Sequence, residues 1–136
     1  VESTLRMFVT LSENGYMDYV YKAVTNETYP SYAYWVKSGL TTLPEDWDMS
    51  QSQNHQSFSV INYWLYCYVG GIRYTDDGLL IEPVKITDVD YVKVTHKGIE
   101  VERNKDEVKV TLPSKARVKI GETDKEFDAG TYMFSF

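Results

Sequence analysis

The sequence predicts an α+β fold in which a helical first half is followed by an antiparallel β-sandwich. Two observations support this prediction. Apolar residues recur at helical spacing as far as about residue 72, and from about residue 79 short Val- and Ile-rich runs alternate with charged residues. We therefore expect two parts, a helical segment over residues 1–72 and a β-sandwich domain over residues 79–136.

The first half carries patterns for four helices. The first begins at a Ser3 cap and ends near Gly15, and the second follows at once over residues 17–24. A short third helix covers residues 32–38, and a fourth, more apolar helix covers residues 58–69 before a pair of glycines. Helices joined in this way are expected to pack as antiparallel pairs.

The second half has the two-residue period of β-strands. Its strand-like runs are separated by turn signals at intervals of about 8–12 residues, which is the spacing of all-β sandwiches. The alternation predicts that each strand buries one face. The predicted strands are residues 79–81, 91–94, 99–102, 108–112, 118–120 and 131–134.

Charge and hydropathy exclude several classes of partner. The chain has 136 residues, with 20 acidic against 14 basic side chains and a net charge of −6. A phosphate-rich surface would be repelled, so neither nucleic acid nor an anionic membrane is an expected partner. The longest apolar stretch, over residues 60–72, is shorter than the about 20 residues of a membrane-spanning helix, and it predicts a buried helix.

Disulfide, metal and cofactor chemistry have little support in the sequence. Cys67 is the single cysteine, so no internal disulfide can form, and its apolar surroundings predict a buried structural thiol. The two histidines, His55 and His96, lie in different halves of the chain and at no metal-ligand spacing. We therefore predict no metal and no cofactor.

The start of the chain has the character of an internal segment. Residues 1–5 lack the basic region and apolar core of a signal peptide, so the sequence does not indicate a compartment. The chain also lacks an initiator Met and enters a helical pattern within a few residues. We therefore expect it to be a piece of a longer protein.

The segment over residues 41–55 carries most of the functional information. Glu45, Trp47 and His55 bring a carboxylate, an indole and an imidazole into a stretch with little apolar periodicity between two helical patterns. A carboxylate beside an indole suits action on water next to a sugar ring, because the indole offers the ring a flat apolar face. Simpler interpretations remain open, namely a solvated or helix-capping acid and a structural histidine or N-terminal turn at His55.

Five stretches, in this order, resemble the carboxyl-terminal part of bacterial α-L-rhamnosidases. They are Tyr-Pro-Ser-Tyr at residues 29–32, Gly-Leu-Thr-Thr-Leu-Pro-Glu-Asp-Trp at 39–47, Asn-His at 54–55, Trp-Leu-Tyr at 64–66 and Gly-Gly-Ile at 70–72. The resemblance is strong over this part of the chain and architectural beyond it. It implies that the helices are the last of an (α/α)6 toroid, which in that family is followed by a β-sandwich.

The resemblance also implies roles for four residues of the loop. Glu45 would be the general base that activates water for single-displacement, inverting hydrolysis of a glycosidic bond. Asn54 and His55 would bind sugar hydroxyls, and Trp47 would help to form the wall of the sugar subsite. The implied substrate is a carbohydrate that ends in rhamnose or a similar deoxy sugar.

The general acid of such a reaction is not found in the sequence. Inverting hydrolysis needs a second carboxyl group about 6.5–9.5 Å from the base. In the family this acid lies upstream of the Tyr-Pro-Ser stretch, where Glu2, Glu13 and Glu27 lie in helix-end contexts typical of surface charges. We therefore expect the chain to be inactive alone and to need the rest of a catalytic domain.

Two further expectations follow from an incomplete helical domain. Helices without their neighbours would expose apolar surface, through which the chain would self-associate. An alternative function is a non-catalytic carbohydrate-binding or interaction module, whose loop and aromatic residues hold sugar without cleaving it.

Overall fold

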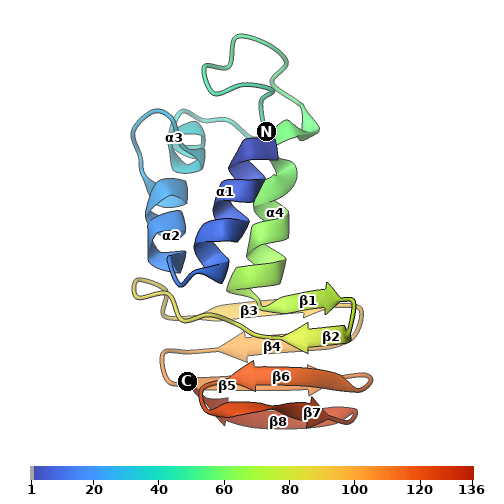
Figure 1. The fold of residues 1–136 in the computed structure, drawn as a ribbon. Coiled ribbons are helices and arrows are strands. Elements are labelled where there is room, and N and C mark those ends of the chain that lie inside the picture. Colours follow the sequence, from blue (N-terminus) through green and yellow to red (C-terminus); the bar gives the residue numbers. More distant parts are fainter. Residues whose placement is uncertain (1) are drawn as a thin grey trace. The chain divides into compact units, whose positions relative to one another are not determined.

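The computed structural model describes residues 2–136, so Val1 and the side chain of Glu2 lie outside the described part. The chain divides into two compact units. The helical unit ends at Trp64, and the sheet unit covers Leu65–Phe136 (Figure 1). Within the described residues, no helix has the length and apolar character needed to cross a bilayer.

Over its described residues, the helical unit contains four α-helices and one short 3-10 helix. Helix α1 packs against both α2 and α4, and α2 also contacts α3 (Figure 1). The predicted third helix is confirmed to within one residue. The elements are α1 (Glu2–Glu13), α2 (Met17–Thr25), α3 (Tyr32–Lys37), η1 (Gln56–Ser59) and α4 (Val60–Trp64).

Helix α1 joins the core of the helical unit through Phe8 and Ser12, which are both buried. The indole Nε1–H of Trp64 donates a 2.9 Å hydrogen bond to the Ser12 hydroxyl, and the Phe8 ring lies 5.9 Å from the Trp64 ring. Gly15, at φ +83, terminates the helix as predicted. The predicted cap at Ser3 is wrong, because the helix already begins at Glu2 and Ser3 lies in its first turn.

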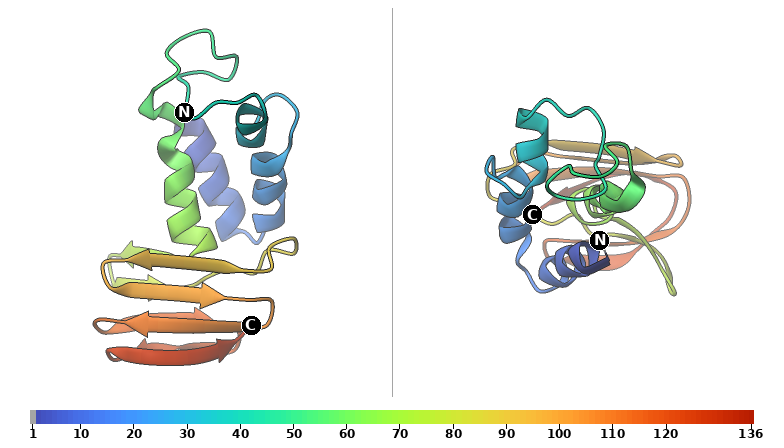
Figure 2. Two further views of the ribbon diagram at one scale, coloured as in Figure 1. Left: turned by 180° about the vertical axis from the view of Figure 1, so that it is seen from behind. Right: turned by 90° about the horizontal axis from the view of Figure 1, so that it is seen from above.

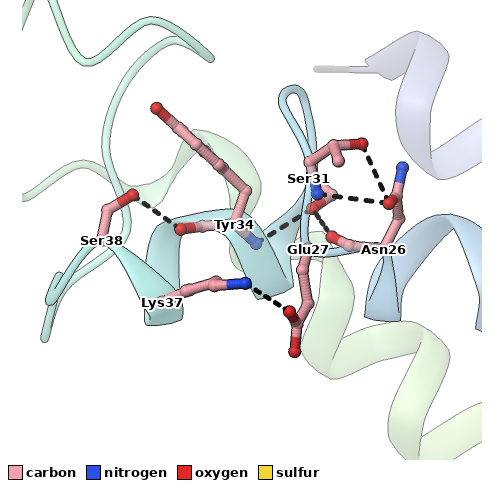
Figure 3. Close-up of polar contacts among 7 residues, drawn as sticks. Asn26, Glu27, Ser31, Tyr34, Lys37 and Ser38 are labelled. Atoms are coloured by element: carbon pink, nitrogen blue, oxygen red, sulfur yellow. Dashed lines mark hydrogen bonds and ion pairs between the residues drawn. The ribbon is translucent and has the colours of Figure 1, made fainter.

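Helix α3 begins at a side-chain cap. The Ser31 hydroxyl accepts a 3.0 Å hydrogen bond from the Tyr34 amide and donates to the carbonyl of Asn26 at the end of α2 (Figure 3). An ion pair of 2.5 Å joins Lys37 of α3 to Glu27, in the connection between α2 and α3 (Figure 3). These contacts hold α3 on α2, and α3 then leads into the loop over residues 41–55.

The fourth predicted helix, over residues 58–69, is helical but changes type along its length. Its first part is η1 and α4. Its last part is the π-helical segment η2 (Leu65–Val69) of the sheet unit, where the Gly70 amide donates to the Leu65 carbonyl at 2.8 Å. The boundary between the compact units falls between α4 and η2, whereas the sequence pattern predicted a helical segment over residues 1–72.

The sheet unit contains two four-stranded sheets, with orders β1-β2-β6-β7 and β3-β4-β5-β8. Six of the eight strands coincide with predicted runs. The strands are β1 (Ile72–Thr75), β2 (Gly78–Ile81), β3 (Val92–His96), β4 (Ile99–Arg103), β5 (Glu107–Leu112), β6 (Ala116–Ile120), β7 (Thr123–Phe127) and β8 (Gly130–Ser135).

The expectation of wholly antiparallel pairing is wrong at one place. Strands β2 and β6 pair in parallel, with Leu80 opposite Arg117 and Ile81 opposite Val118. The other five pairings are antiparallel. Strands β2 and β6 are far apart in sequence, so a hairpin turn does not constrain their relative direction.

The inward residues of both sheets form one hydrophobic cluster, with members from β1, β2, β4, β5 and β6. Alternate residues of β4 point into it, namely Ile99, Val101 and Arg103.

Arg103 is an exception to the apolar character of the cluster. Its side chain is 1% exposed, and none of its three side-chain nitrogens has a hydrogen-bond partner within the described part of the chain. Burial lowers the pKa of this guanidinium, which lies 5.6 Å from the Phe136 ring.

Candidate functional site

The loop over residues 41–55 projects from one end of the helical unit (Figure 2). Its two arms run side by side and are joined by backbone hydrogen bonds. The Glu45 amide donates to the Ser52 carbonyl, and the His55 amide donates to the Leu43 carbonyl, both at 2.8 Å. The Thr42 hydroxyl adds a further bond to the Gln53 carbonyl. Glu45 and His55 are therefore fixed on opposite arms of a single hydrogen-bonded loop.

The tip of the loop is a turn closed by acidic side chains. The Ser50 amide donates to carboxylate oxygens of Asp46 and Asp48, each at 3.0 Å, and the Ser50 hydroxyl donates to Asp46 at 3.1 Å. Hydrogen bonding by Ser50 holds the pKa of Asp48 below its ordinary value. These two carboxylates are therefore used to close the turn.

Glu45 is arranged differently from the two aspartates. Its residue is exposed, and among the described residues its carboxylate has no hydrogen-bond or ion-pair partner. Its backbone is nevertheless fixed, because its amide is bonded within the loop and the preceding Pro44 is fully buried. The result is a solvent-facing carboxylate on an ordered main chain, which can accept a proton from water without first breaking another contact.

Trp47 lies in a cluster of aromatic rings. It is half-buried and stacks on Trp35, and it also contacts Phe58 and Tyr32 at centroid distances of 4.4 and 5.7 Å. The Trp35 indole N–H donates to the Trp47 carbonyl at 3.1 Å, and the Tyr32 hydroxyl donates to the Phe58 carbonyl at 2.9 Å. Trp47 thus joins the loop to α3 and η1, and only part of its ring is available to a ligand.

Asn54 and His55 close the second arm of the loop. Asn54 is exposed, and its backbone exchanges two 3.3 Å hydrogen bonds with the Ser52 hydroxyl. His55 is half-buried and caps η1, because its Nδ1 accepts a 3.0 Å hydrogen bond from the Ser57 amide. The interpretation of His55 as part of an N-terminal turn is confirmed.

The acidic residues upstream of the loop have the surface character that the sequence predicted, as far as the structure describes them. Glu13 is exposed at the end of α1, and Glu27 is exposed in its ion pair with Lys37, which holds the pKa of Glu27 below its usual value. The side chain of Glu2 lies outside the described residues. Within the described part of the chain, no three His, Cys, Asp or Glu side chains are grouped to hold a metal ion.

The remaining candidate side chains lie in the sheet unit. His96 is at the end of β3, with its ring near the rings of Tyr66 and Tyr74. Cys67 is half-buried, rather than buried as its apolar surroundings predicted. Neither residue belongs to the same compact unit as the loop.

Several residues that shape the site were not singled out by the sequence. Ser52 and Ser57 form hydrogen bonds that fix the second arm of the loop. The rings of Trp35 and Phe58 pack against Trp47. The position of Ser57, two residues after His55, is a signal for a local side-chain cap. The aromatic cluster has no such signal, because its members come from separate elements.

Comparison with known proteins gives consistent matches. Residues 3–69 match the model of the bacterial alpha-L-rhamnosidase 6 hairpin glycosidase domain. The chain is 36% identical over 73 residues to an alpha-L-rhamnosidase of Formosa agariphila, a match that covers 46% of the chain. It is 30% identical over 80 residues to one of Streptomyces avermitilis, covering 51% of the chain. In both cases the match spans 8% of the relative's length.

The fold is similar to parts of solved structures. An alpha-L-rhamnosidase of Aspergillus terreus superposes with a TM-score of 0.84 at 20% identity, covering 97% of this chain and 18% of that one. The Streptomyces avermitilis alpha-L-rhamnosidase complexed with L-rhamnose gives a TM-score of 0.81 at 20% identity, covering 98% and 17%. At these identities the similarity concerns the fold.

These matches first define the class of protein as glycoside hydrolase, because the family model describes a glycosidase domain and both relatives are named alpha-L-rhamnosidases. More narrowly, residues 3–69 match the bacterial α-L-rhamnosidase family, as the order of the sequence stretches at residues 29–72 predicted. The chain corresponds to a small part of the length of the relatives and solved structures that it matches.

Proposed function

We propose that this chain supplies the general base and part of the sugar subsite of an inverting glycoside hydrolase. The substrate would be a carbohydrate that ends in L-rhamnose or a similar deoxy sugar. In this proposal α1–α4 are the last helices of an (α/α)6 toroid, and the two sheets are a β-sandwich that follows it. The family membership of residues 3–69 supports this assignment.

The state of the Glu45 carboxylate is the observation that carries the proposal. Among the charged residues of the loop, Asp46 and Asp48 accept hydrogen bonds from Ser50, whereas Glu45 has no partner among the described residues and faces solvent. In an inverting reaction a carboxylate removes a proton from water as that water attacks the anomeric carbon. Glu45 is the acid in the loop whose lone pairs are free for this step.

The other loop residues would position the sugar. Asn54 is exposed and offers an amide group, and His55 offers its imidazole from the same arm of the loop. Trp47 would present the edge of its ring that the aromatic cluster leaves uncovered, while its stacked face anchors the loop. Because one face of the indole anchors the loop, Trp47 would have a larger structural role than an indole that only stacks on a sugar.

The general acid would come from a part of the catalytic domain outside this chain. Exposed apolar side chains on three helices fit such an arrangement, since they would contact neighbouring helices of a complete toroid. They are Met7, Val36 and Tyr63, which are 47%, 73% and 49% exposed. We propose that this surface contacts the rest of the domain and that the isolated chain is inactive.

The experiment is substitution of Glu45 in the full-length enzyme that contains this chain. Glu45→Gln keeps the size of the side chain and removes its basicity, so turnover of an aryl rhamnoside should fall by at least about 10²-fold, with a small change in KM. The matched control is Glu122→Gln, at an exposed residue of the sheet unit. Near-normal turnover of Glu45→Gln would remove Glu45 from the mechanism, and sugar binding without turnover in the unmodified protein would favour a binding module.

A further inference from the structure

The imidazole of His55 receives two hydrogen-bond donors at one ring nitrogen. The Ser57 amide lies 3.0 Å from Nδ1, and the Ser57 hydroxyl oxygen lies 2.6 Å from the same atom. A backbone amide can only donate, so Nδ1 must present its lone pair to it. The hydroxyl then also donates to Nδ1, because a deprotonated nitrogen has no proton to give.

This arrangement fixes the tautomer of the neutral ring. With Nδ1 deprotonated, the ring proton of neutral imidazole is on Nε2. Among the described residues no group forms a hydrogen bond with Nε2, so this N–H is unused by the fold. The two nitrogens therefore have separate functions, one as the cap of η1 and the other as a donor that remains available.

We propose that Ser57 is a positioning residue that holds His55 as an Nε2–H donor, so that His55 donates a hydrogen bond to an oxygen of the bound sugar and does not act as a base. The identity of the ligand rests on the function proposed above. The tautomer assignment rests only on the contacts between His55 and Ser57. The two parts can therefore fail separately.

The tautomer is tested on the 136-residue chain by long-range ¹H–¹⁵N correlation spectra of the histidine rings. At a pH where His55 is neutral, the spectrum should show a protonated Nε2 and a lone-pair Nδ1 in a single tautomer. Ser57→Ala removes the 2.6 Å hydroxyl donor and leaves only the 3.0 Å bond from the backbone amide, so both nitrogen shifts should move part of the way toward those of a mixed tautomer. Ser57→Thr keeps the hydroxyl and should restore them. His96 is the internal reference, since it lies in the sheet unit.

A protonated Nδ1 in the unmodified chain would overturn the tautomer assignment. Identical His55 shifts in the unmodified chain and in Ser57→Ala would show that the Ser57 hydroxyl does not position the ring, and would overturn the role proposed for Ser57. Neither result depends on catalytic activity, so neither bears on Glu45.

The donor role is tested with two substitutions of His55 in the full-length enzyme. His55→Asn keeps an acceptor at the capping position, because asparagine is a good helix cap. It loses the Nε2–H donor, because the asparagine side chain is shorter than the imidazole. It should leave Tm near that of the unmodified enzyme and raise KM at least tenfold. His55→Gln reaches further with its amide N–H and should recover part of the affinity. An unchanged KM in His55→Asn at normal Tm would restrict His55 to its capping role and overturn the proposal, even where Glu45→Gln is inactive.

Discussion

The indole of Trp47 lies on the indole of Trp35, with ring centroids 4.5 Å apart and ring planes 23° apart. The contact joins the middle of the loop over residues 41–55 to helix α3, and the Trp35 N–H bond to the Trp47 carbonyl reinforces it. The loop that carries Glu45 is therefore anchored two residues away from the carboxylate. An ordered loop of this kind can hold a water molecule in one geometry, as catalysis requires.

Loss of this stacking should destabilise the helical unit. Truncation of a fully buried large aromatic residue to alanine lowers the free energy of unfolding by about 3–5 kcal/mol. Trp47 is half-buried, so Trp47→Ala should lower it by about 2 kcal/mol. Trp47→Phe keeps a ring in the cluster and should cost less. Urea denaturation measures both variants. Unchanged stability of Trp47→Ala together with weakened sugar binding would instead favour a mainly ligand-facing indole.

The buried hydroxyl of Tyr32 predicts a difference in stability at high pH. Burial raises the pKa of this phenol, so ionisation is disfavoured in the folded state relative to the unfolded state. The resulting stabilisation is fully present below the ordinary tyrosine pKa of about 10 and is lost as the pH rises above it. When the pH is raised from neutral to above about 10, the free energy of unfolding should therefore fall less in Tyr32→Phe than in the unmodified chain.

At neutral pH the same substitution has a cost. Tyr32→Phe removes the donor to the Phe58 carbonyl and should lower the free energy of unfolding by about 1–2 kcal/mol. Parallel pH dependences for the two proteins would contradict a buried hydroxyl. Tyr19→Phe is the control, because Tyr19 is 66% exposed.

Arg103 should destabilise the sheet unit in its present environment. Its guanidinium is buried and has no hydrogen-bond partner among residues that the structure describes, and the Phe136 ring compensates for only part of the lost hydration. Arg103→Met fills a similar volume without charge and should raise the free energy of unfolding by about 1–2 kcal/mol. Denaturation monitored in the sheet unit checks this. A loss of stability would show that the guanidinium is satisfied by a group such as bound water. Arg117→Met, which removes an exposed ion pair with Asp124, should change stability by less than about 1 kcal/mol.

The exposed apolar surface of the helices predicts self-association of the isolated chain. Val36 is the most exposed of its members, so Val36→Lys should reduce association without loss of helical structure. Sedimentation velocity over a range of concentrations measures the effect, with circular dichroism as the control for folding. A monomeric unmodified chain at all concentrations would argue against helices that lack their neighbours.

The local elements of the fold follow from the sequence more closely than the pairings do. The helices at residues 17–24 and 32–38 and six strands are recovered, because periodicity and glycine positions report local structure. Strand β7 was missed, because its central residues Asp124, Lys125 and Glu126 are all exposed and do not alternate. The parallel pairing of β2 with β6 depends on contacts between distant segments, which periodicity does not record.

The same contrast between local sequence patterns and contacts of distant segments holds for the candidate site. Its residue types were predicted from a single stretch of sequence, and the capping interpretation of His55 was among the alternatives. The engagement of Asp46 and Asp48 by Ser50, which distinguishes Glu45 from its neighbours, depends on the conformation of the turn. The anchoring of Trp47 depends on rings from α3 and η1, which only the folded chain brings together.

The most direct test of the central claim is rescue of Glu45→Ala by azide in the full-length enzyme. Azide needs no deprotonation and is small enough to occupy the space left by the carboxylate, so it would replace the water that Glu45 is proposed to activate. Glu45→Ala should have very low turnover in water, and azide should restore cleavage and yield a rhamnosyl azide of inverted anomeric configuration. Near-normal turnover of Glu45→Ala in water, without formation of the azide product, would contradict it.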